Sequence, residues 1–349
     1  MKKNSVVIVT IIVAVLVLAS CGKEGSTSGK EVYEFDFNVQ APPNHKFNTD
    51  TVEPWAEFVE EETNGRIKIN VFSSGALGAY ETSLQDIKGG VYDIGYANPS
   101  LQRDTELFPL TIGELPFAIN DSFKGRKILE QFNEKYVSDS YEGTTFMSVV
   151  SSDSYQLVSK KPVESFSDVE GKKINAIGNE RADLVDAWGG APVTLGLSQM
   201  YEALERGTVD QVIYLGIGAV GYKLFEVAPN LTKLDMGAMN FVYMVNSQSL
   251  DQLPEDLRET FLEKLSPKLA ELTAEMYTNE EQKAFEEFEA QGGNVTTLEN
   301  KDLQEFKDSS EVVWENWVEE ANKKGYPGEE MMNYFKELLE EEEMDIPFE

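Results

Sequence analysis

Apolar and polar residues along most of the chain recur in the patterns typical of alternating strands and helices. Alternation of apolar and polar positions predicts strands over 32–39, 67–71 and 94–96, and an apolar run predicts another over 146–150. Between the first two strands, apolar residues at helical spacing predict a helix over 52–59 that ends near Asn64-Gly65. This strand-helix-strand order is the pattern of an α/β protein whose sheets are covered by helices.

The pattern changes after residue 245, where helices dominate. A very long amphipathic helix up to Gly292-Gly293 is predicted by apolar residues that repeat every three or four positions: Leu257, Phe261, Leu265, Leu269, Leu272 and Met276. Pro267 is predicted to kink or split this helix, because it lacks the N–H that a helix interior needs. One further helix is predicted to carry Leu303, Phe306, Trp314 and Trp317, and a last one follows Pro327-Gly328.

The first 21 residues predict a secretory signal peptide with a lipid-attachment site. Lys2 and Lys3 precede an uncharged run over 6–19, which ends at Leu18-Ala19-Ser20-Cys21. Cys21 is the only cysteine of the chain, which suits a lipid acceptor better than half of a disulfide. The alternative is an uncleaved N-terminal anchor, and both interpretations place the following domain outside the cytoplasmic membrane. Residues 22–31 are Gly/Ser-rich and predict a flexible tether.

Composition and charge narrow the classes of partner. The remaining chain of about 320 residues is long enough for two domains. Because it has no second cysteine, we expect packing and not disulfides to stabilise it. The formal net charge of −32 argues against nucleic acid and anionic lipid surfaces, which would repel the protein. Runs such as 60–62 and 340–343 indicate a solvated acidic surface. An acidic metal site is the alternative, but these runs lack the oxygen spacing and turn glycine of a calcium loop.

The sequence shows no catalytic constellation. The single histidine, His45, lies in a polar turn after the first strand, and no nucleophile elbow, phosphate-binding loop or Cys/His metal spacing occurs. We therefore expect no enzyme activity, no metal and no cofactor.

A series of short motifs carries more specific information. In chain order they are Leu77-Gly78 with Glu81, 86–94 (DIKGGVYDI), Phe108-Pro109-Leu110, Leu115-Pro116-Phe117, Lys161-Pro162-Val163, Gly171-Lys172-Lys173-Ile174, 189–193 (GGAPV), 201–204 (YEAL) and 207–210 (GTVD). The ordered series resembles the DctP-like solute receptors of tripartite ATP-independent periplasmic (TRAP) transporters. The resemblance runs from about residue 32 to the long helix and weakens over the last 60 residues.

This resemblance implies a two-lobed fold of the periplasmic-binding-protein type, with mixed sheets flanked by helices and a long helix connecting the lobes. It implies one lobe over 32–152 plus about 240–280, and another over 153–239 plus about 281–349. The lobes are expected to close around one small organic solute and to deliver it to the membrane permease subunits. A sensory receptor of the same fold, which would signal to a membrane partner, and an extracytoplasmic enzyme on a similar scaffold are the alternative functions.

The resemblance also shows where this chain departs from its relatives. After Gly171-Lys172-Lys173-Ile174 the family usually has an arginine that binds a substrate carboxylate, and this chain has Asn175. Two explanations remain open. Arg181 could replace the missing cation, or the solute could be neutral or zwitterionic, and the uncharged amide of Asn175 slightly favours the second explanation.

Other candidate ligand contacts follow from the same matching of motifs. Tyr214 stands where relatives place a polar side chain facing the ligand, and Leu197 stands where many have an aromatic ring. The same matching adds Tyr155, Gln156 and Glu81. Two further candidates, Asn98 and His45, follow predicted strands at loops where such folds bind ligands. Tyr214 could instead be a packing residue and Glu81 a helix cap, whereas Trp188 is expected in the core.

Overall fold

The computed structural model describes residues 31–348. The predicted signal peptide, the lipid acceptor Cys21 and nearly all of the tether lie outside the described residues. Within 31–348, no helix is both long enough and apolar enough to cross a membrane.

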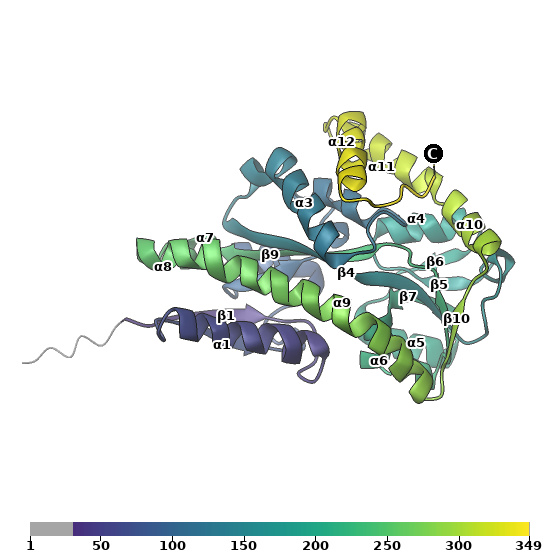
Figure 1. The fold of residues 1–349 in the computed structure, drawn as a ribbon, viewed down its shortest axis with the longest axis horizontal. Helices are drawn as coiled ribbons and strands as arrows, with labels where there is room; N and C mark the ends of the chain where they lie inside the picture. The colour runs from purple at the N-terminus through teal and green to yellow at the C-terminus, as the bar shows by residue number, and fades with distance from the viewer. Residues whose placement is uncertain (1–30, 349) are drawn as a thin grey trace, which may run out of the picture. The chain divides into compact units, whose positions relative to one another are not determined.

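Ten strands of the described chain form the mixed sheet that an α/β protein requires (Figure 1). The order along the main path is β2-β1-β3-β9-β4-β7-β5-β6, while β8 pairs with β4 and β10. The strands are β1 (Tyr33–Asn38), β2 (Ile67–Phe72), β3 (Ile94–Ala97), β4 (Thr144–Ser159), β5 (Lys173–Asn175), β6 (Ala191–Val193), β7 (Gln211–Leu215), β8 (Asn230–Lys233), β9 (Ala238–Asn246) and β10 (Asn294–Thr297). The strands predicted over 32–39, 67–71, 94–96 and 146–150 are confirmed.

Strand β4 joins two groups of strands. Its first part pairs antiparallel with β9, which in turn pairs with β3, and its last residues, from Tyr155 onward, pair with β7 and β8. The register against β9 shifts between Ser151 and Ser154, where the change of partners occurs. We call β1, β2, β3, β9 and the first part of β4 the first strand group, and the other strands the second.

Helices flank the strands, as the α/β pattern predicts. They are α1 (Glu53–Glu62), α2 (Ser83–Lys88), α3 (Ser122–Tyr136), α4 (Asn179–Ala187), α5 (Met200–Arg206), α6 (Gly216–Gly221), α7 (Ser247–Leu250), α8 (Glu255–Thr260), α9 (Ser266–Ala290), α10 (Asn300–Asp308), α11 (Glu311–Lys323) and α12 (Gly328–Glu341). Figure 1 shows α9 as the longest of them, running from the α7–α8 region to α5 and α6.

The long predicted helix is interrupted where Pro267 disturbs it. Helix α8 is followed by a π-helical turn, Phe261–Leu265, and α9 then begins with Pro267 in its first turn. The carbonyl of Leu265, the last residue of this turn, accepts a hydrogen bond from the indole Nε1–H of the buried Trp55 at 2.8 Å. The predicted split near Pro267 is confirmed, and α9 packs against both strand groups through β4 and β10.

The prediction of one helix from Leu303 to Trp317 is wrong, because two helices, α10 and α11, occupy this region. Their junction is Ser309-Ser310, whose hydroxyls bond the carbonyls of Phe306 and Lys307 at 2.8 and 2.6 Å. Serine hydroxyls that bond nearby carbonyls compete with helix continuation. Strand β10, which pairs in parallel with β8, was also not predicted.

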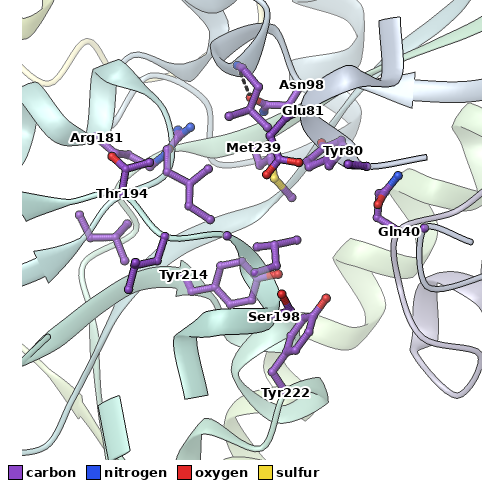
Figure 2. A pocket seen from close by; sticks show the side chains of 18 of the residues that line it. Gln40, Tyr80, Glu81, Asn98, Arg181, Thr194, Ser198, Tyr214, Tyr222 and Met239 are labelled. Carbon is purple, nitrogen blue, oxygen red and sulfur yellow. Dashed lines mark hydrogen bonds between the residues drawn. The ribbon is translucent and has the colours of Figure 1, made fainter. Parts of the chain in front are cut away.

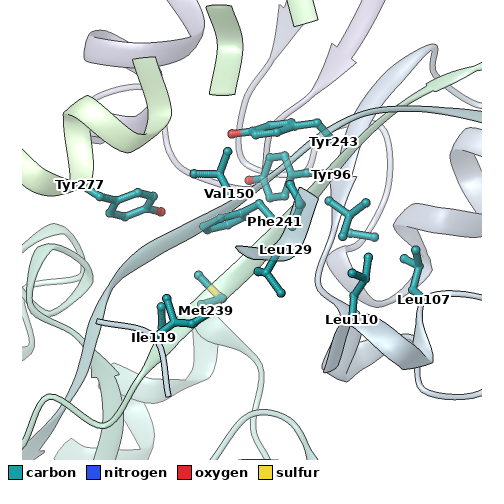
Figure 3. Packing of buried hydrophobic residues seen from close by; sticks show 14 of the residues in the cluster. Tyr96, Leu107, Leu110, Ile119, Leu129, Val150, Met239, Phe241, Tyr243 and Tyr277 are labelled. Carbon is teal, nitrogen blue, oxygen red and sulfur yellow. The ribbon is translucent and has the colours of Figure 1, made fainter. Parts of the chain in front are cut away.

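The core next to the strand junction is rich in aromatic rings (Figure 3). Phe241 and Tyr243 of β9 both pack edge-to-face on Tyr96 of β3, with ring centroids 5.3 and 5.8 Å apart. Tyr277 of α9 stacks on Phe241 at 5.8 Å. Because such ring pairs add to the free energy of apolar burial, they hold α9 firmly against the first strand group.

The C-terminal helices contact elements from both parts of the chain. Phe306 of α10 packs on Trp188, whose predicted place in the core is confirmed, whereas Phe335 of α12 packs on Phe132 of α3. The exact division of the chain into lobes stays a prediction.

Candidate ligand-binding site

A cavity of about 330 Å³ lies where loops and strand ends of the two strand groups meet. Its lining residues from the first group and its loops are Gln40, Ser74, Gly75, Ala79, Tyr80, Glu81, Asn98, Leu101 and Met239. Those from the second group and its loops are Tyr155, Ile177, Arg181, Thr194, Leu195, Gly196, Leu197, Ser198, Ile213, Tyr214 and Tyr222. Loops at strand ends are where folds of this class commonly bind small molecules.

Figure 2 shows how these side chains surround the cavity. Arg181 and Thr194 approach it from one side, and Tyr80, Glu81 and Gln40 from the other. Residues from positions 40 to 239 therefore share one site, and no local stretch of sequence contains it.

Arg181 is the one cation among the lining residues, and it is 4% exposed. Its Nη2 donates to Glu114 Oε2 at 2.6 Å, its Nε–H bonds the carbonyl of Ile177, and its guanidinium lies 4.5 Å from the ring centroid of Tyr155. Its Nη1 is buried and has no hydrogen-bond partner. A buried arginine nitrogen without a partner is costly unless a bound group supplies an acceptor.

The charge of Arg181 is retained despite burial. Burial lowers the pKa of a guanidinium, but Tyr155, Glu114 and Glu180 outweigh this effect and raise the pKa of Arg181. For Glu114, burial raises the pKa and the Arg181 guanidinium opposes the rise. The carboxylate of Glu114 also accepts hydrogen bonds from the side chain of Asn98 at 2.5 Å and from the backbone N–H of Asn240 at 3.3 Å.

The rest of the lining combines aliphatic and phenolic side chains with a few polar ones, among them Gln40, Asn98 and Thr194. Burial raises the pKa of Tyr80 and Tyr214 well above the ordinary value, so both remain neutral hydroxyls. The hydroxyl of Tyr80 is buried without a partner. Apolar walls with a few polar groups are typical of sites that bind a small organic molecule and exclude water.

The structure brings six of the predicted ligand contacts together around this cavity: Glu81, Asn98, Tyr155, Arg181, Leu197 and Tyr214. Glu81 is exposed and stands at the rim, whereas Tyr155 and Tyr214 are buried. His45 lines a smaller cavity of about 40 Å³ that shares Tyr80, Leu197 and Tyr214 with the main one. The use of these residues by a ligand stays a prediction.

Asn175 and Gln156 do not line either cavity. Asn175 is fully buried, and its Oδ1 accepts from the backbone N–H of Leu195 at 3.0 Å, so it supports the loop that forms the cavity wall. Gln156 accepts from the N–H groups of Leu234 and Asp235 and donates to the Asp235 carboxylate at 2.7 Å.

Several lining residues were not predicted from the sequence, notably Tyr80, Ile177, Tyr222 and Met239. Tyr80 directly precedes the predicted Glu81, so a wider reading of that motif would have found it. Met239 belongs to an apolar strand in which every residue is buried, and no sequence signal distinguishes it from its neighbours.

A cavity between two strand groups that share the long strand β4 is the arrangement of a solute-binding receptor of the periplasmic type. Within residues 31–348, no group of three or more His, Cys, Asp or Glu side chains is arranged to hold a metal ion. Residues 37–321 match the model of the family described as bacterial extracellular solute-binding protein, family 7 (DctP), and the chain belongs to that family.

Curated relatives agree with this assignment. The outer membrane transporter protein TsaT of Comamonas testosteroni is 24% identical over 306 residues, which cover 86% of this chain and 89% of that protein. The C4-dicarboxylate-binding periplasmic protein DctP of Vibrio cholerae is 26% identical over 273 residues, covering 74% and 78% of the two chains.

A solved structure shows the same fold. A TRAP solute-binding protein of Rhodoferax ferrireducens, in complex with copurified benzoate, superposes with a TM-score of 0.83 at 20% identity and covers 89% of this chain and 99% of its own. The predicted fold class and the resemblance to TRAP receptors are confirmed. The protein is an extracytoplasmic solute-binding receptor of the TRAP type, and not an enzyme.

Proposed function

We propose that this receptor captures a small organic carboxylate, held by Arg181, and delivers it to a TRAP permease while anchored to the membrane through a lipid on Cys21. The observation that carries the ligand class is the guanidinium of Arg181, which lines the cavity and has one nitrogen without a protein partner. A carboxylate accepts from an arginine more strongly than a neutral oxygen does.

The sequence left two explanations open and slightly favoured a neutral or zwitterionic solute. This proposal takes the alternative, in which Arg181 replaces the missing arginine. Asn175 supports the wall through Leu195 from outside the cavity lining, so its lack of charge says little about the ligand. Arg181 supplies a cation six positions later in the chain. The carboxylates that name two of the relatives, benzoate and a C4-dicarboxylate, support the same class.

The wall chemistry supports an acid with an apolar body. Four tyrosines and several aliphatic residues line the cavity, and Glu81 at its rim is the one anionic lining residue. A second carboxylate near Glu81 would be repelled. We therefore expect monocarboxylates to bind more tightly than dicarboxylates.

Isothermal titration calorimetry tests the ligand class with matched pairs of probes. Benzoate is compared with benzamide and benzyl alcohol, mandelate with its amide, and succinate serves as the dicarboxylate. Binding of an acid but not of its amide is the expected result. An amide that binds as tightly as its acid would refute a role for charge and restore the neutral-solute explanation.

The contribution of Arg181 is tested in the variant Glu114→Gln/Arg181→Met, which removes both charges and leaves neither buried alone. We expect at least a tenfold loss of affinity for the acid that binds the native receptor. Asn175→Ala is the comparison variant outside the lining, and its effect should be smaller. Unchanged affinity in the double variant would overturn the assignment of Arg181.

A further inference from the structure

Two ion pairs connect the strand groups beside the cavity, and the arginine lies on a different side in each pair. The neighbouring residues Glu180 and Arg181 open α4, which follows β5 of the second group. Arg181 pairs with Glu114, and Glu180 pairs with Arg103. Glu114 and Arg103 both lie in the segment that follows β3 of the first group. Each side thus contributes one acid and one base.

Burial makes these pairs strong constraints. The side chains of Glu114, Glu180, Arg181 and Arg103 are 0%, 2%, 5% and 10% exposed. Breaking a buried pair leaves an uncompensated charge, which is far more costly than the loss of an exposed pair. These contacts therefore differ from the exposed pairs elsewhere on the protein, such as Lys323 with Glu319.

Arg103 is the centre of the second pair. Its guanidinium bonds both Glu180 and Glu320 of α11, so it ties α4 to α11 through one side chain. Ser100 adds a hydrogen bond to Glu180 Oε2 at 2.6 Å. Figure 1 shows α4 next to α11, and the two helices are in contact.

A glycine before α4 allows the start of this helix to approach the segment that contains Ser100 and Arg103 closely. Gly178, with φ of +91°, precedes α4, and a Cβ at this position would lie 2.8 Å from Cβ of Ser100 and 2.5 Å from Nη2 of Arg181. No other residue type would let the two segments come so near. The start of α4 is therefore pressed against the segment that contains Ser100 and Arg103.

We propose that Arg103 is a positioning residue, which holds the two strand groups together around the cavity and fixes the direction of Arg181 through Glu180. Arg103 itself does not line the cavity, so its effect on a ligand passes through α4. Because the four charges pair within the protein, they favour the closed arrangement before a solute arrives. A receptor whose competent state is already populated binds with a smaller conformational penalty.

This inference rests on the proposed role of Arg181 only where ligand affinity is concerned. The primary test therefore measures the free receptor. The full chain carries Cys21→Ser with spin labels at Glu57→Cys on α1 and Glu202→Cys on α5, two exposed positions in helices that pack against β2 and β7, respectively. Pulsed electron spin resonance gives the distance distribution between the labels without any solute.

We expect Arg103→Gln to move this distribution to longer distances and Arg103→Lys to restore part of it, because lysine keeps the charge but not the two-sided fork. Arg66→Gln is the control, since Arg66 directly precedes β2 and its ion pair at 2.8 Å is with Asp256 of α8, away from the contact between the strand groups. It should leave the distribution unchanged. An unchanged distribution in Arg103→Gln would overturn the inference, whatever the ligand proves to be.

Glu320→Gln covers the case in which Arg103→Gln fails to fold. Glu320 is one-third exposed, and Glu320→Gln leaves Arg103 paired with Glu180, so no charge is buried alone and we expect a smaller shift in the same direction. For the ligand, titration with benzoate should show about tenfold weaker affinity in Arg103→Gln. If the label distance lengthens while benzoate binds neither protein, the positioning role holds and the proposed ligand class fails instead.

Discussion

The buried pair of Glu114 and Arg181 provides the sharpest test of how this site is held together. Glu114→Gln removes the negative charge and leaves the guanidinium of Arg181 buried without the carboxylate that its Nη2 bonds at 2.6 Å. Breaking such a pair costs about 3–5 kcal/mol. That is a large share of a total unfolding free energy of about 5–15 kcal/mol. Arg181→Met strands the carboxylate of Glu114 in the same way.

The double variant Glu114→Gln/Arg181→Met should be more stable than either single variant. Its amide oxygen can still accept from Asn98 and from the N–H of Asn240, the two other donors to Glu114. Neutral replacement of a whole buried pair is often close to neutral in free energy. Because each single change costs about 3–5 kcal/mol and the double change little, we expect the two effects to be non-additive by several kcal/mol.

Urea unfolding followed by tryptophan fluorescence measures this double-mutant cycle, because the chain contains four tryptophans. The slope of free energy against urea must stay constant across the four proteins for the comparison to hold. Additive effects, with the double variant as unstable as the sum of the singles, would refute the pairing and with it the structural account of the site.

Three further predictions concern titration and anchoring. Burial lowers the pKa of His45 to about 4, and its Nδ1 accepts from the N–H of Phe47 at 3.1 Å, so its NMR ring signal should stay constant from pH 8 to 5.5; titration near 6.5 would contradict this burial. Burial, reinforced by Glu281, raises the pKa of Asp153 well above 3.8. The folded state therefore binds this proton more tightly than the unfolded state does. The stabilisation that the proton provides is complete below pH 3.8 and is lost as the pH rises through the folded-state pKa. At pH 7.5, urea unfolding of Asp153→Asn should therefore give a free energy of unfolding about 1–3 kcal/mol above that of the native protein, and near pH 4 the two should differ little. If the variant and the native protein were equally stable at both pH values, the prediction would be wrong. Radioactive palmitate should label the native chain in cells and not Cys21→Ala, and labelling that persists in the variant would disprove the anchor.

Much of the fold was predictable because its signals are local. The alternation in 33–38 and 67–72 requires only that one face of a strand be buried, and both strands occur where the pattern places them. The break between α10 and α11 was missed because apolar spacing continues across it while two serine hydroxyls take the carbonyls that continue a helix.

The candidate site was predictable mainly where short motifs matched a family. Motif matching named Glu81, Tyr155, Leu197 and Tyr214, which line the cavity. Two other lining residues were named on other grounds: Asn98 from its loop after a strand, and Arg181 as the nearest substitute for the missing arginine. Met239 and Tyr222 were not predicted, because nothing in the sequence distinguishes them from other buried strand residues or half-buried loop residues. Family matching also named Asn175, which lies outside the cavity lining, because a motif gives a position along a strand but not what the side chain contacts there.

The sequence by itself determined the fold class, the receptor family and the acidic character of the chain, since these depend on periodicity, motif order and composition. Tertiary structure alone decided which charges meet. Arg181 is 67 residues from Glu114 and Glu180 is 77 from Arg103, and only the folding of both segments against each other brings them together. The direction of Asn175 was decided in the same way by Leu195, 20 residues away. Pairing over such separations depends on the packing of whole elements, which no local pattern of residues encodes.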